Sequence, residues 1–272
     1  MSAPSRSKIR PPREGEAPAA AALVIGAYLR AVRLARGLTG SEAAGTIGCS
    51  AARLSRVETG RLHWTADATD LLERYGIDDL PSLTAVEYLL QGPHRHILSD
   101  HAPGWLDRLH ACLRQAETVV IYSAFSIPHM VRIPTYPTDS LTQRLRGGPV
   151  RVRHAQVTVD NGEGVTLVVD ELALERLLSQ PSVWSAQLSH LRQLASSPQG
   201  PRMLVLPLDV GMIPPASLMY GMTLHGHVMV AEEGIGFVSY YTGDEAAQRC
   251  HFLSAALDAG LPFEQAVVGR TA

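Results

Sequence analysis

The sequence predicts an all-α N-terminal domain followed by an α+β C-terminal domain with a small, mainly antiparallel sheet. In the first third of the chain, apolar residues recur at helical spacing, as Ile25, Leu29 and Val32 do. Beyond residue 104, amphipathic helical segments alternate with short β-rich runs. A chain of 272 residues is also long enough for two domains of ~100–200 residues each. We expect a basic disordered tail, a helical domain, a linker and an α+β domain over residues 1–20, 21–92, 93–104 and 105–272.

Local start and stop signals place the helices of the N-terminal domain. Gly37, Gly48 and Gly60 each follow a helical segment, where glycine often ends a helix. Thr39 or Ser41 can cap the second helix, because short hydroxyl side chains accept hydrogen bonds from free backbone N–H groups. The first helix starts at Leu23, and the later ones cover Ser41–Ile47, Ala51–Glu58, Ala66–Tyr75 and Ser82–Gln91.

The C-terminal region mixes the two periodicities. Glu232-Glu233-Gly234 suggests a hairpin between two strands. The predicted helices are Trp105–Glu117, Leu172–Leu178, Val183–Ala195 and Glu245–Leu257. The predicted strands are Val165–Val169, Met203–Leu206, Met219–His225 and Ile235–Tyr240. This alternation indicates an α+β domain.

Charge is distributed unevenly along the chain. Residues 1–63 hold ten basic and four acidic groups, a net charge of +6, whereas residues 64–272 carry −8. A basic first quarter on an acidic body is typical of a polyanion-binding module attached to a second domain. Four of the ten basic groups lie before residue 14, so a basic tail accounts for part of the asymmetry.

The chain has the composition of a cytoplasmic protein. No run reaches the ~18 consecutive apolar residues of a membrane-spanning helix, and the polar N-terminus lacks a secretion signal. Cys49, Cys112 and Cys250 are far apart and have no metal-binding or redox spacing. We therefore expect no membrane association and a reducing compartment.

Residues 38–60 have the pattern of a DNA-binding helix-turn-helix. The tight turn Gly48-Cys49-Ser50 makes two short helices cross steeply, and the second helix presents its N-terminal end outward. Ala51 and Ala52 are small enough for close approach to base edges, and Arg56 can reach a guanine. Arg53 and Arg61 are suited to phosphates. The expected DNA-binding residues are Ser41, Ser50, Ala51, Ala52, Arg53, Ser55, Arg56 and Arg61.

The string "GLTGSEAAGTIGCSAARLSRVETG" ends in the pattern SRxExG, and residues 23–60 resemble the lambda-repressor-like (XRE-family) helix-turn-helix domain. The resemblance implies a buried ion pair between Arg33 and Glu58, so that Glu58→Ala should cost ~3–5 kcal/mol. Gly40 departs from the family, because many relatives have a phosphate-binding Gln there. Ser41 and Arg36 are the candidates to replace that anchor.

Residues ~95–265 resemble the DUF5753 domain of actinobacterial regulators called Scr1-type antitoxin-like regulators. The resemblance rests on the strings "GWLDRLHACLRQAETVVIYSAFSIPHMVRIPTYP", "LVVDELALERLL", "MLVLPLDVG" and "YYTGDEAAQRCHFLSAALDAGLPFEQA". The segment "YSAFSIPHMVRIPTY" diverges from the usual family pattern. The resemblance implies a small partner protein of the DUF397 type.

Other residues are weaker candidates. His225 and His227 alternate along a predicted strand, and His94 and His96 do so in the linker, but no Cys or carboxylate lies at ligand spacing, so we expect no metal. Asp170-Glu171 fits a helix cap better than a catalytic pair. Nucleotide-binding and nucleophile-elbow patterns are missing, so we expect no cofactor and no enzyme. An apolar ligand pocket or a partner surface is the hypothesis for Tyr122, Phe125, Tyr136, Met219, Tyr220 and Tyr240.

The sequence thus predicts a cytoplasmic transcription regulator that reads DNA with helix Ala51–Glu58 in the major groove. One such helix contacts only a few base pairs, so we expect a homodimer on a palindromic operator. Two alternatives stay open. One is an antitoxin-like adaptor for a small protein, and the other is a regulator that responds to an apolar small molecule.

Overall fold

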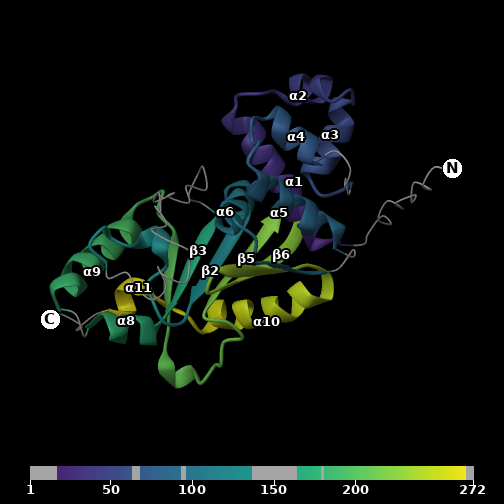
Figure 1. Ribbon diagram of the computed structural model, residues 1–272. Helices are drawn as coiled ribbons and strands as arrows, with labels where there is room; N and C mark the ends of the chain where they lie inside the picture. The colour runs from purple at the N-terminus through teal and green to yellow at the C-terminus, as the bar shows by residue number, and fades with distance from the viewer. Residues whose placement is uncertain (1–16, 63–67, 93–95, 137–163, 179–180, 268–272) are drawn as a thin grey trace.

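The computed structural model describes residues 17–62, 68–92, 96–136, 164–178 and 181–267. The helical region forms the upper part of the molecule in Figure 1. Its helices are α1 (Ala20–Ala35), α2 (Gly40–Thr46), α3 (Ala51–Glu58), α4 (Ala68–Arg74) and α5 (Leu80–Gln91). Most of the tail predicted for residues 1–20 lies outside the described residues.

Side-chain caps start the two central helices. Thr39 Oγ1 accepts from the Glu42 N–H at 3.2 Å while Glu42 accepts from the Thr39 N–H at 2.8 Å, so Thr39 rather than Ser41 begins α2. The Ser50 hydroxyl accepts from the Arg53 N–H at 3.2 Å and begins α3. The predicted bounds of α3 are confirmed because both of its end signals are local.

An eight-stranded sheet dominates the rest of the described chain, in the order β1-β7-β6-β5-β2-β3-β4-β8. The predicted α+β fold is confirmed, but the sheet is larger than expected, and β2, β3 and β4 run parallel. The predicted turn at Glu232–Gly234 is wrong: these residues belong to β6, a strand that the sequence did not indicate, and the hairpin from β6 to β7 turns at Ile235 and Gly236. The strands are β1 (Ile97–Asp100), β2 (Thr118–Ser123), β3 (Val165–Asp170), β4 (Arg202–Leu206), β5 (Leu218–Leu224), β6 (His227–Gly234), β7 (Phe237–Tyr241) and β8 (Leu261–Pro262).

Helices cover both faces of the sheet. The helix α10 (Gly243–Ala259) lies along one face (Figure 1), where Leu253 is buried against the sheet. Because side chains alternate along a strand, Leu167 and Val169 point to the other face. That face is covered by α6 (Trp105–Gln115), α8 (Glu171–Leu178), α9 (Pro181–Ser196) and α11 (Phe263–Ala266). The short 3₁₀ turns are His129–Val131 and Leu208–Val210.

Helix α1 belongs to two hydrophobic cores. Ile25 and Leu29 pack in the core of the helical region. Leu23, Val24 and Ala27 pack in the core beneath the sheet, with residues of α6. The two regions therefore share one helix.

The predicted linker, residues 93–104, contains regular structure in its described part. Residues 97–100 form β1, which pairs antiparallel with β7, so that Ile97 faces Tyr241. Asp100 at the end of β1 forms a buried ion pair with Arg108 of α6. The expectation of an irregular connection fails here because a short strand gained a distant partner.

Candidate DNA-binding interface

Helix α3 is divided sharply into a buried and an exposed side. Leu54, Val57 and Glu58 are at most 4% exposed and fix the helix to the domain. The opposite side is open to solvent and offers small residues at its start and an arginine one turn later. All the residues expected at DNA are exposed, namely Ser41, Ser50, Ala51, Ala52, Arg53, Ser55, Arg56 and Arg61.

A buried ion pair holds the end of α3 to α1. Arg33 Nε lies 2.6 Å from Glu58 Oε1, and Arg33 Nη2 lies 2.8 Å from Oε2, a two-pronged arrangement. Arg33 Nη1 also donates to the Leu38 carbonyl at 2.7 Å, at the start of the segment leading to α2. Arg33 and Glu58 thus form the pair that the family resemblance implied. One arginine therefore connects α1, the turn before α2 and α3.

Two glycines let α3 come very close to α1. A Cβ on Gly26 would meet the Val57 carbonyl oxygen at 2.4 Å, which no rotamer change can relieve. Gly60, with φ +71°, lies against Leu23 in the same way. The sequence did not indicate the role of Gly26, because a glycine inside a helical pattern has several possible explanations.

Ser41 and Arg36, the two residues suggested to replace the phosphate-binding Gln, have different environments in the structure. Ser41 is exposed on the first turn of α2, as a phosphate contact requires. Arg36 instead donates from Nη2 to the Gly76 carbonyl at 3.0 Å, beyond the end of α4. Arg36 therefore braces the domain in this structure.

The six residues expected to form a ligand or partner surface are not brought together. Tyr122 and Met219 are buried on the α10 face, whereas Tyr220 and Tyr240 are buried on the opposite face. Tyr136 is half-buried, and Phe125 alone of the six is exposed. The single-pocket expectation fails because neighbouring positions of a strand point to opposite faces.

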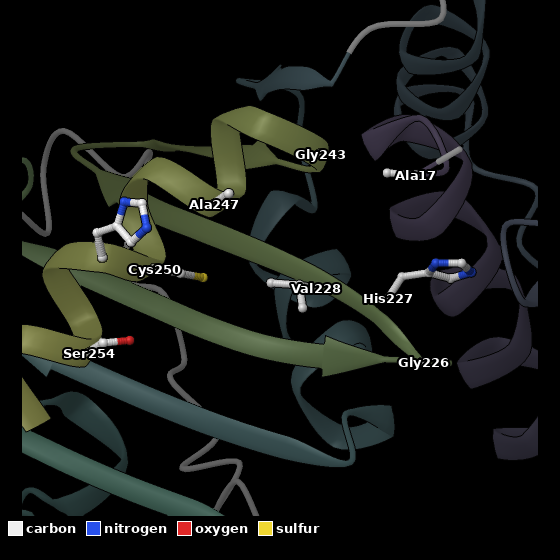
Figure 2. A pocket seen from close by; sticks show the side chains of 9 residues that line it. Ala17, Gly226, His227, Val228, Gly243, Ala247, Cys250 and Ser254 are labelled. Carbon is white, nitrogen blue, oxygen red and sulfur yellow. The ribbon is translucent and has the colours of Figure 1, made fainter. Parts of the chain in front are cut away.

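A hollow of about 630 Å³ opens where the two regions meet. Figure 2 shows Val228 of β6 and Cys250 and Ser254 of α10 along one wall, with Ala17 near the other. Ala247 also lines it. The residues predicted to bind an apolar ligand take no part in this hollow.

The acidic and histidine residues considered as catalytic or metal-binding candidates have other positions or roles in the structure. The Leu172 N–H donates to Asp170 Oδ1 at 2.9 Å, and the Tyr122 hydroxyl donates to Oδ2 at 3.0 Å, so Asp170 starts α8 as a cap would. His225 and His227 do not alternate on one strand, because a turn separates them at the end of β5. His94 lies outside the described residues. Within the part that the structure describes, no three His, Cys, Asp or Glu residues are grouped as a metal site.

The geometry is that of a helix-turn-helix, and comparison with known proteins supports a DNA-binding regulator family. A family model described as a helix-turn-helix domain matches residues 24–91, and a model described as a domain of unknown function, DUF5753, matches residues 106–265. The second match covers more than half of the chain, so the protein belongs to the DUF5753 family. No curated protein matches the chain. Among the described residues, no helix is long and apolar enough to cross a membrane.

Proposed function

We propose that this protein is a sequence-specific transcription regulator that binds duplex DNA with α3 in the major groove. The observation that supports this most strongly is the exposed side of α3, backed by an ion pair and a glycine contact that fix its position. The family match to a helix-turn-helix domain is independent support. Side chains reach base edges specifically only when their backbone is held in place, and α3 meets that condition.

In this proposal Arg56 makes the main base contact and Arg53 and Arg61 contact phosphates. Arg56 extends from the exposed side of α3, and its length suits a two-pronged bond to guanine. Ala51 and Ala52 at the first turn allow the helix to approach the bases but offer no side-chain hydrogen bonds. Because so few contacts specify little sequence, we propose a homodimer on two half-sites about one helical turn apart.

The test is selection of a preferred duplex from a random DNA library by the full chain, followed by binding measurements. Arg56→Ala should weaken binding to the selected duplex by ~1–3 kcal/mol and relax the preference at one base pair per half-site. Arg202→Ala, an exposed arginine on β4, is the matched control and should bind like the parent. Equal affinity of Arg56→Ala and parent at the same salt concentration would refute the assignment.

A second candidate is an antitoxin-like adaptor that holds a small protein of the DUF397 type. Exposed apolar side chains follow the ends of two parallel strands that flank β3, at Phe125 after β2 and at Leu208 and Ile213 after β4. Ile213 is 89% exposed, the largest exposed fraction of these three apolar side chains. Co-expression of the full chain with the neighbour-encoded small protein tests this, and Ile213→Asp should abolish co-purification if the candidate is right.

A further inference from the structure

The turn between β5 and β6 has an unusual backbone. Leu224 pairs with His227, so His225 and Gly226 form a two-residue turn, and both have positive φ, +52° and +78°. Such turns favour Asn-Gly or Gly-Gly, because the left-handed region is costly for most side chains. Histidine is one of the non-glycine side chains enriched at positive φ, and here the turn places its imidazole at the end of the hairpin.

This turn is fixed against the end of α6 and lies near α1. The Gly226 N–H donates to Glu117 Oε1 at 3.1 Å, just beyond α6. Two residues earlier, Gln115 Nε2 donates to the Ala27 carbonyl of α1 at 2.7 Å. Figure 2 shows His227 at the tip of the hairpin, directed away from α10 and toward the N-terminal helical region. The C-terminal domain thus places two imidazoles beside a helix of the DNA-binding domain.

Two arginines of the helical region act electrostatically on these imidazoles, Arg30 on His225 and Arg61 on both. Arg30 lies on α1 one turn after Ala27. Arg61 follows Gly60, which packs on Leu23 of α1, so it emerges on the side of α1 where α3 ends. In the part of the chain that the structure describes, neither guanidinium has a hydrogen bond or an ion pair. The two domains therefore contribute cationic groups to one cluster.

Positive charges dominate the surroundings of the two imidazoles. Burial and then the Arg30 charge lower the pKa of His225, with His227 and Arg61 adding to this and Glu117 opposing it. Burial and then Arg61 lower the pKa of His227, again against Glu117. One carboxylate thus faces two guanidiniums and two imidazoles. Arg30 Nε and His225 Nε2 are, in addition, buried and have no hydrogen-bond partner among the described residues.

We propose that Arg30, Arg61 and the turn His225–His227 form one binding site for a phosphate of the DNA backbone, beside the end of α3. The inference rests on the proposed function, which lays DNA along α3, and extends it, because the C-terminal domain then takes part in DNA binding directly. A backbone phosphate supplies the negative charge that the two guanidiniums lack, and it accepts hydrogen bonds from both arginine and imidazole. The fixed turn keeps the imidazoles in place for that contact.

Phosphate binding at this site is coupled to protonation. In the free protein burial and the neighbouring arginines favour neutral imidazoles, whereas a bound phosphate favours the charged form and raises their pKa. DNA binding therefore takes up protons, and affinity increases as the pH falls from 8 to 6. The charged groups facing the imidazoles are Arg30, Arg61 and Glu117.

The test uses the full chain and a 30-base-pair duplex of arbitrary sequence, because phosphate contacts are independent of sequence. Affinity is measured at pH 6 and pH 8 over a range of salt concentrations. For the parent we expect binding at least ~3-fold tighter at pH 6, because protonated imidazoles add positive charge at the phosphate. Arg61→Ala should lower the slope of log affinity against log salt by about 0.9. His227→Gln should remove most of the pH dependence.

Matched controls separate this site from general charge effects. His190→Gln on α9 and Arg202→Ala on β4 should keep the parent's salt slope and pH dependence. His225→Asn is the second variant, because asparagine tolerates positive φ and preserves the turn while removing the imidazole. Unchanged slope and pH dependence in Arg61→Ala, His227→Gln and His225→Asn would overturn the inference while leaving the proposed function intact. A parent that binds no duplex DNA would overturn both.

Discussion

The N-terminal and C-terminal regions each contain a buried, two-pronged ion pair, Arg33–Glu58 and Arg108–Asp100 respectively. The two pairs differ in how far apart their partners lie in the sequence. The first spans 25 residues and ties the recognition helix to α1. The second spans only eight residues, between β1 and α6. Long-range pairs set the relative position of elements, whereas short-range pairs stabilise one local path of the backbone.

The Arg108–Asp100 pair, whose partners are close in sequence, makes more hydrogen bonds than the Arg33–Glu58 pair. Arg108 also donates to the carbonyls of Pro103 and Ala102, both at 3.0 Å, and its side chain is 1% exposed. Arg33 is 8% exposed and donates to one carbonyl besides Glu58. The comparison shows that the segment after residue 96 is an internal part of the fold, held as firmly as the recognition helix.

The largest expected effect comes from breaking the local pair. Asp100→Ala leaves the Arg108 guanidinium buried without its counterion, and we expect a loss of ~5 kcal/mol in the free energy of unfolding. Urea denaturation measures it. The double variant Asp100→Leu with Arg108→Met should recover much of the loss, because two apolar side chains leave no stranded charge. A single variant as stable as the parent would show that the pair has no structural importance.

Glu58→Ala should cost less, ~3 kcal/mol, because Arg33 is near enough to the surface to regain some hydration. It should also weaken binding to a selected DNA duplex, since the end of α3 loses its tie to α1. Asp100→Ala should leave the affinity of the folded fraction nearly unchanged. If Glu58→Ala and Asp100→Ala lost the same affinity for the DNA duplex, the idea that only the Arg33–Glu58 pair positions α3 would be wrong.

A smaller effect is expected at the helix contact that accompanies the long-range pair. Gly26→Ala places a methyl group 2.4 Å from the Val57 carbonyl oxygen, and the required shift should cost ~1–3 kcal/mol. Gly45→Ala in α2 is the control, because its added methyl meets nothing within 4 Å and should stabilise the helix by ~0.5–1 kcal/mol. The melting temperatures of both variants test this. A higher melting temperature for Gly26→Ala than for the parent would disprove the close contact.

The sequence predicted the features that depend on neighbouring residues. The bounds of α3 follow from Ser50 and Gly60, and the exposed side of α3 follows from the spacing of Leu54 and Val57. These signals act within about two helical turns, so that periodicity and capping are enough to predict them.

Features that depend on distant partners could not be predicted. The strand β1 has four residues and exists because it pairs with β7, more than a hundred residues later. Tyr122 and Tyr220 look alike as aromatic residues of strands, but which face each occupies depends on the register of the sheet. The cluster around His225 depends on the packing of two domains, which no local pattern encodes.

Helix α1 has a consequence for anyone who dissects this protein. A fragment ending near residue 92 would retain α1 but leave Leu23, Val24 and Ala27 uncovered, as an apolar stripe in water. The complementary fragment would lose those side chains from above Leu109 and Leu113 of α6. Both pieces should aggregate or rearrange, although the sequence suggests a convenient cutting site between them. Such a regulator cannot readily exchange its DNA-binding domain with that of a relative unless the new first helix fits both cores.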